Sequence, residues 1–312
     1  MGASSRKQTI FRNVWLHFLF MLLDIGYYVR WVVDFNRDSS NAFNSFHFNH
    51  VIALFDMRTT QIGKYKVEIY DAIEDLPMQR FHKYNKMLLV DAGIGSDLAD
   101  FDRHIEKAML YAKGKTPELA AVELENMRQN VYFIQSGISP RCLAFAVLVK
   151  SIDGKEQNDL SDDALQNIVN MFSDVPIKEI TANIEAVKKK IDDELQMYFP
   201  RLFEDSTIKE YFDELRRRTL LVLDSIVNGE TPEKTEQIEK ITMELLTYNK
   251  PKVFTGADSM EISHDKQFER MCLLLSQHLN VNPKQYTVLE FYNAFEYMQE
   301  MLKEQAKKGK RK

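Results

Sequence analysis

The chain has 312 residues, a formal net charge of −5 and a hydrophobic content of 45%. This length and composition are sufficient for one large hydrophobic core or two smaller ones. The mildly acidic balance argues against a protein that wraps nucleic acid, which would need an excess of basic residues. The two cysteines, Cys142 and Cys272, lie in apolar helical runs, so we expect buried thiols without a disulfide framework, as in a reducing cytoplasm.

Residues 1–60 differ in composition from the rest of the chain. They contain both tryptophans but no glutamate, which first occurs at Glu68, and Lys7 is the only lysine before Lys64. We therefore interpret this stretch as an aromatic-rich extension that is either disordered or lies upstream of a native start at Met57.

A membrane anchor is one alternative for residues 10–35. Basic residues precede the apolar run Val14–Leu23, an order that matches the front of a signal peptide. No small-residue cleavage site follows the run. Asp24, Arg30 and Asp34 come after it and prevent a continuous apolar span, because each charge near a bilayer centre costs about 2.5–3.5 kcal/mol of insertion free energy. We therefore do not expect a membrane partner, and tethering through residues 10–35 is kept as an alternative.

Beyond residue 60 the sequence predicts an all-α body of about nine helices with one short N-terminal β-strand. The strand is expected at Lys64–Tyr70, where polar and apolar residues alternate, and everything after it is expected to be helical. Ser96 is predicted to cap the second helix. The helices with predicted ends are 77–91, 96–114, 176–199, 206–228, 264–279 and 287–306. Further starts with a hydroxyl N-cap are predicted at Thr116, Ser139, Ser161 and Thr231, and Thr287 and Glu290 form a capping box.

The predicted elements follow one another as consecutive subdomains. Their boundaries are expected in the acidic loop 153–159 and in the loop 251–263. The subdomains are a strand with helices at 64–150, a central helical block at 160–250, a C-terminal helix pair at 262–303 and a basic tail at 304–312.

No motif in the sequence specifies an enzymatic activity. Apart from His104, the histidines beyond residue 60 belong to no catalytic or metal-binding pattern; they are His82, His264 and His278. Carboxylates near His104 lack the spacing of a calcium loop and are expected to cap helices and complement their dipoles, namely Asp91, Asp97, Asp100 and Asp102. We therefore predict a protein that is not an enzyme, with no cofactor and no metal site.

The last predicted helix carries the candidate partner-binding site. Its apolar residues recur at three- and four-residue steps along one face, with Tyr292 and Tyr297 outside that stripe. The stripe is either core or a surface for a partner helix, and we assign it to partner binding: Phe291, Phe295, Met298 and Leu302. The basic residues that follow are a second candidate, as a contact for a polyanion: Lys307, Lys308, Lys310, Arg311 and Lys312.

Five segments carry a resemblance to a known family: 73–81 (IEDLPMQRF), 89–98 (LVDAGIGSDL), 160–165 (LSDDAL), 198–200 (YFP) and 282–292 (NPKQYTVLEFY). They resemble an uncharacterised family encoded by Bacteroides-infecting tailed phages, over roughly residues 64–302. The resemblance implies a role in virion morphogenesis, and the closing helix pair is similar to that of tail-assembly chaperones. It implies other virion or tail proteins as partners, in the host bacterial cytoplasm or the virion.

The functional expectation is therefore a non-enzymatic virion-assembly or structural protein that binds partners through apolar helical stripes. Self-association as a homo-oligomer is compatible with this expectation. Two alternatives are kept: a nucleic-acid-associated phage or mobile-element protein that uses its basic tail, and a membrane-tethered protein.

Overall fold

The computed structural model describes residues 58–114, 116–200, 206–248 and 250–309. The chain divides into two units, each built from separate stretches of sequence. Among the described residues, unit 1 comprises 58–92, 138–200 and 261–309, and unit 2 comprises 93–114, 116–137, 206–248 and 250–260. This organisation corrects the expectation of consecutive subdomains, because the stretches 64–150 and 160–250 each contribute to both units.

Unit 1 contains a small antiparallel sheet. Its strands are β1 (Arg58–Ile62), β2 (Tyr65–Ile69), β3 (Val149–Ile152) and β4 (Lys155–Glu156), which pair in that order. The predicted strand corresponds to β2, where Val67 and Ile69 are fully buried. The sequence suggested that the chain after β2 is entirely helical. This expectation is wrong, because β3 and β4 also follow β2. β3 continues directly from an apolar helix, so its residues have no separate signal in the sequence.

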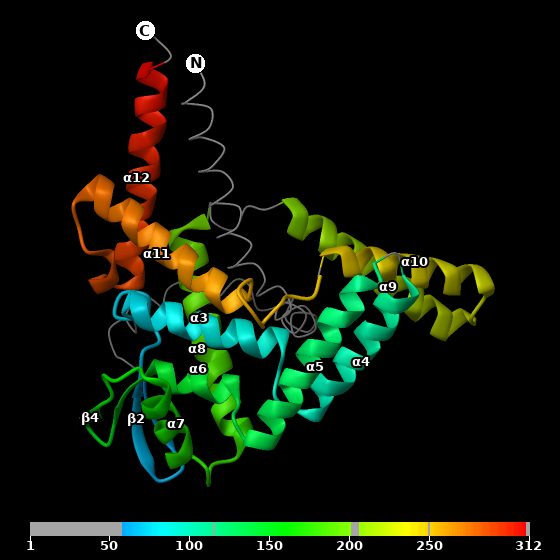
Figure 1. Cartoon of the computed structure of the whole chain (residues 1–312), viewed down its shortest axis with the longest axis horizontal. Helices are drawn as coiled ribbons and strands as arrows, with labels where there is room; N and C mark the ends of the chain where they lie inside the picture. The colour runs from blue at the N-terminus through cyan, green and yellow to red at the C-terminus, as the bar shows by residue number, and fades with distance from the viewer. Residues whose placement is uncertain (1–57, 115, 201–205, 249, 310–312) are drawn as a thin grey trace, which may run out of the picture. The chain divides into compact units, whose positions relative to one another are not determined.

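In the described part of unit 1, six α-helices accompany the sheet (Figure 1). Ser139 and Ser161 cap two of them, as predicted, because their hydroxyls accept hydrogen bonds from the amides of Cys142 and Ala164. The loop 153–159 lies inside this unit, since it includes the β3–β4 turn, and is not a domain boundary. The helices are α3 (Met78–Gly93), α6 (Pro140–Leu148), α7 (Asp162–Met171), α8 (Ile177–Tyr198), α11 (Met260–Leu279) and α12 (Val288–Gly309).

The start of α12 is tied to the segment before α3. The amide of Met78 donates to the carbonyl of Tyr286 at 2.8 Å, and the amide of Val288 donates to the carbonyl of Leu76 at 2.9 Å. The predicted capping box at Thr287 and Glu290 is confirmed, since each side chain accepts a hydrogen bond from the other residue's amide. The two bonds between backbone groups bring residues more than 200 positions apart in sequence into one core.

Helix α11 packs between α3 and α12, as Figure 1 also shows. The ring of Phe268 on α11 lies 4.1 Å from the ring of His82 on α3 and 6.1 Å from the ring of Phe291 on α12, measured between centroids. Tyr292 on α12 lies 5.4 Å from Phe199 at the end of α8. The apolar residues of α12 therefore complete the core of unit 1.

Unit 2 consists of two helical hairpins, α4 (Leu98–Lys113) with α5 (Glu118–Ser136) and α9 (Ser206–Asn228) with α10 (Pro232–Tyr248). The hydroxyl of Tyr111 on α4 donates to the carbonyl of Leu246 on α10 at 3.3 Å. At Gly93 the absence of a side chain admits the ring of Phe254, because a Cβ there would lie 2.2 Å from its Cζ atom. The Tyr111–Leu246 bond joins the two hairpins, and the Gly93–Phe254 contact joins the segments that precede α4 and follow α10.

The helix ends in unit 2 agree in part with the predicted caps. Asp97, not Ser96, caps α4 by accepting from the amide of Asp100. The Thr116 hydroxyl does not cap α5: no side chain caps the helix at Pro117, and the Thr116 carbonyl accepts from a following amide instead. Thr231 caps α10 as predicted, with its hydroxyl 3.3 Å from the amide nitrogen of Lys234.

Ten α-helices and four strands lie in the described residues, so the predicted, mostly α-helical class is confirmed. No single helix in this part of the chain is both long and apolar enough to cross a bilayer. The consecutive helices α5 and α6 meet that criterion of length and composition only when they are taken together. Residues 10–35 lie outside the described ranges.

The position of Phe291 in the core predicts a large effect on stability. We expect Phe291→Ala to lower the free energy of unfolding by about 3–5 kcal/mol, because it leaves a cavity at a fully buried site. Tyr297→Ala on the same helix is the matched control, with an expected change within about 0.5 kcal/mol, because that side chain is exposed. Urea denaturation followed by circular dichroism measures both, and equal effects would contradict the assignment.

Candidate functional site

The predicted partner-binding stripe of α12 is buried in unit 1. Phe291, Phe295 and Met298 are at most 3% exposed, and Leu302 is partly exposed. Tyr292, which we expected outside the stripe, is also buried, whereas Tyr297 is exposed as expected. The assignment of this stripe to an exposed binding surface is therefore corrected, because its side chains pack on α11 and α8 of the same unit.

The basic tail lies largely outside the described residues. Lys307 is exposed on the last turns of α12, and Lys308 belongs to the same helix. Lys310, Arg311 and Lys312 fall beyond the described range, so the polyanion contact stays a prediction.

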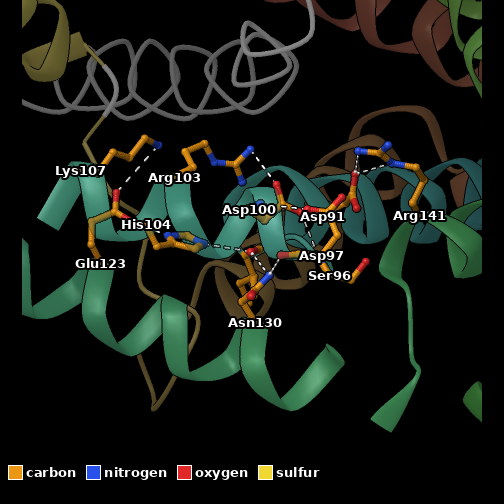
Figure 2. A network of polar contacts seen from close by, with 11 residues as sticks. Asp91, Ser96, Asp97, Asp100, Arg103, His104, Lys107, Glu123, Asn130 and Arg141 are labelled. Atoms are coloured by element: carbon orange, nitrogen blue, oxygen red, sulfur yellow. Dashed lines mark hydrogen bonds and ion pairs between the residues drawn. The ribbon is translucent and has the colours of Figure 1, made fainter. Parts of the chain in front are cut away.

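The carboxylates of the α3–α4 region serve the ends of helices and ion pairs (Figure 2). In unit 2, Asp97 caps α4, and Asp100 accepts from the amide of Ser96 at 3.0 Å and pairs with Arg103 at 2.9 Å. In unit 1, Asp91 pairs with Arg141 at 3.0 Å. Asp102 is exposed, and the described residues hold no group of three or more side chains arranged to bind a metal ion.

His104 is the centre of a buried polar network in unit 2, shown in Figure 2. Its Nδ1 atom lies 2.6 Å from Oε2 of Glu123 on α5, and its Nε2 atom lies 2.9 Å from the carbonyl oxygen of Ile94. The side-chain amide of Asn130 donates to the same carbonyl at 3.2 Å. The network therefore fastens the loop before α4 onto α5 and leaves His104 inaccessible to a substrate.

Loss of Glu123 is expected to destabilise unit 2. We expect Glu123→Ala to cost about 3 kcal/mol or more, because it leaves His104 and Lys107 beside a buried site without their carboxylate. Glu125→Ala, two residues along α5, is the control and should have little effect, since Glu125 contacts only Arg128 and Gln129 within one turn of its own helix, at the surface. Thermal unfolding of the two variants side by side checks this, and a larger loss for Glu125→Ala would refute the ranking.

A second histidine cluster joins α3 to α11 in unit 1. The ring of His82 stacks between His264 and Phe268, with centroids 4.3 and 4.1 Å away. Its Nε2 atom lies 2.9 Å from Asp265, and Lys86 Nζ lies 2.8 Å from the same carboxylate. Burial lowers the pKa of His82 below its usual value, although the hydrogen bond to Asp265 opposes that shift.

This cluster contains a hydrogen-bonded histidine–carboxylate pair, His82 with Asp265. Burial raises the pKa of both thiols, Cys142 and Cys272, the latter to about 11, so neither is a thiolate at neutral pH. His264 donates to the backbone carbonyl of His82 at 3.1 Å, which fixes the two helices in register. The arrangement is suited to holding α11 on α3.

The stability of unit 1 should depend on pH through His264. Burial lowers its pKa from 6.5 to about 3, so between these values the unfolded chain binds a proton that the folded chain does not. Stability is therefore lost as the pH falls below 6.5, by about 2 kcal/mol at pH 5.

Urea denaturation at pH 7.5 and pH 5 measures this dependence. The decrease between the two pH values should be smaller in His264→Gln, by about 2 kcal/mol, because glutamine does not titrate. Comparing decreases removes any constant cost of the substitution. Equal decreases in both proteins would contradict the role assigned to His264.

The exposed face of α9 in unit 2 is the candidate interaction surface. Leu220, Leu223, Ile226 and Val227 are 55%, 44%, 74% and 78% exposed, and we call them the α9 stripe. Among the described helices, α9 is the one that exposes four large apolar side chains within two turns. None of its described side chains, from Glu210 to Asn228, is fully buried.

Charged side chains border the α9 stripe on a shallow groove between α9 and α10. Asp224 pairs with Lys234 on α10 at 2.7 Å, and Arg217 lies 3.8 Å from Glu214 one turn earlier. The groove is lined by Asp213, Arg216, Arg217, Leu220, Leu221, Asp224 and Gln237. An apolar strip with a charged border is the usual composition of a protein contact surface.

Sequence reasoning did not identify the α9 stripe. The signal was present, because residues 220–223 are all apolar and residues 226 and 227 are apolar again, so α9 is hydrophobic on more than one face. A helix with that pattern is normally buried on both sides. Among the described residues, α10 packs against α9, whereas Leu220, Leu223 and Ile226 stay exposed.

Comparison of the chain with protein-family models, with curated proteins and with solved structures found no match.

Proposed function

We propose that this chain is a non-enzymatic assembly protein that binds other proteins by helix–helix packing through the α9 stripe. The observation that carries the proposal is the exposure of Leu220, Leu223, Ile226 and Val227 on one helix. Full burial of a large aliphatic side chain from complete exposure is worth about 1.5–3 kcal/mol, and covering these partly exposed side chains yields a fraction of that value. Such a surface is disfavoured in water and is stabilised when a partner covers it.

The polar clusters support a non-enzymatic role. His104 and Glu123 are each 1% exposed and are bonded to the loop before α4, so they are not accessible to a substrate. His82 lies between two rings and pairs with Asp265, an arrangement that joins helices. Both clusters are explained by the stability that they give to their own unit.

The class of partner is proposed from the sequence resemblance. The segments that resemble a family of tailed-phage proteins extend over residues 64–302, which includes α9. We propose that the chain takes part in virion assembly, with other virion or tail proteins as its partners.

Co-expression with candidate virion and tail proteins of a tailed phage tests this function. The chain should co-purify with one of them, and Leu220→Asp/Leu223→Asp should reduce recovery of the partner at least tenfold, because two charges would enter an apolar contact. Tyr132→Asp, at an equally exposed position on α5 of the same unit, is the control and should leave recovery unchanged.

Circular dichroism of the double variant establishes that its helices are retained, since both substituted positions are exposed in the chain alone. Unchanged recovery of the partner with a correctly folded double variant would reject the α9 stripe as the contact surface.

A further inference from the structure

We propose that a second copy of this chain packs its α9 antiparallel against α9, so that the two α9 stripes cover each other. This inference rests on the proposed function, because it names one partner of the same surface. Three features of the described helix lead to it: the spacing of its exposed residues, the order of its charges and the groove beside the stripe.

The exposed residues of α9 have the spacing of a coiled-coil seam. Asp213, Arg216, Leu220, Leu223 and Val227 follow one another at steps of three, four, three and four residues. This 3.5-residue repeat keeps one line of side chains facing a partner helix along its whole length. The centre and the C-terminal end of the line are apolar, and its start is charged.

An antiparallel alignment brings the apolar positions of two copies together. With the two-fold axis between Leu220 and Leu223, Leu220 of each copy faces Leu223 of the other. Val227 then lies against the aliphatic stem of Arg216 in the other copy, which keeps the guanidinium in water. The contact is therefore apolar at its centre and polar at both ends.

The charges on α9 are complementary in this alignment. Arg217 and Asp224 flank the seam one heptad apart, and antiparallel pairing places Arg217 of each copy opposite Asp224 of the other. The two-fold axis repeats this ion pair. A parallel alignment places Asp224 opposite Thr219 instead and gives no ion pair across the seam. The order of the charges therefore favours an antiparallel second copy.

The contacts within one copy are compatible with this pairing. Asp224 accepts from Asn228 and pairs with Lys234, but a carboxylate has about four acceptor positions. The pair of Arg217 with Glu214 is long, at 3.8 Å, and Arg217 is largely exposed. Both side chains line the shallow groove with Leu220, so Leu223 of the second copy has a recess to enter.

Sedimentation velocity of the full natural chain, and of variants in which the charge at Arg217 or Asp224 is reversed, tests the proposal. The natural chain should be a dimer at micromolar concentration, and Leu220→Asp/Leu223→Asp should be a monomer. Arg217→Glu alone and Asp224→Arg alone should each raise the dissociation constant roughly tenfold, because each places like charges opposite one another twice.

An equimolar mixture of Arg217→Glu and Asp224→Arg should restore the natural dissociation constant. In the mixed dimer, Glu at 217 faces Arg at 224 on one side, and the natural pair is kept on the other. Glu239→Arg on α10 is a charge reversal away from the seam and is the control, with no expected change.

A natural chain that stays monomeric up to about 100 µM would overturn the proposal, as would single variants that bind as well as the natural chain or a mixture that does not recover. Loss of a virion partner in Leu220→Asp/Leu223→Asp, with a monomeric natural chain, would remove the second copy and leave the proposed function standing. If the natural chain is a dimer and its disruption leaves recovery of the virion partner unchanged, the second copy is supported and the α9 stripe is rejected as the contact for a virion partner.

Discussion

The packing of α12 into unit 1 determines which apolar surface is left for a partner. Phe291, Phe295 and Met298 are buried against α11, and the amides at the start of α12 are bonded to the segment before α3. To expose this stripe, unit 1 would have to give up several large buried side chains, at a cost comparable to the whole stability of a small domain. The exposed apolar residues of α9 carry no such cost, so they are the surface that we propose for association.

The buried polar groups of both units have a common role. His104 with Glu123, and His82 with His264 and Asp265, each join elements that are distant in sequence, and each histidine is hydrogen-bonded or paired. A buried polar group is tolerated only when it is hydrogen-bonded, so these contacts favour the helix arrangement in which every partner is in place. The carboxylates beside these histidines are therefore explained by the packing of helices within each unit.

The sequence was sufficient for the helices and insufficient for their grouping. The hydroxyl caps at Ser139, Ser161 and Thr231 were predictable because capping depends on residues within one turn. β3 was missed because its apolar residues continue those of α6, and the fate of the α12 stripe was missed because periodicity cannot distinguish core from interface. The α9 stripe could have been suspected from its apolar circumference, but its exposure depends on which helices share its unit.

Hydrogen–deuterium exchange of the full chain, at concentrations below and above self-association, distinguishes α9 from α12 as the contact surface. Amides between Arg217 and Asn228 on α9 should exchange more slowly at high concentration, whereas those of α12 from Val288 to Met298 should be protected equally at both concentrations. Exchange in α9 that is independent of concentration, together with new protection on α12, would contradict the assignment to α9.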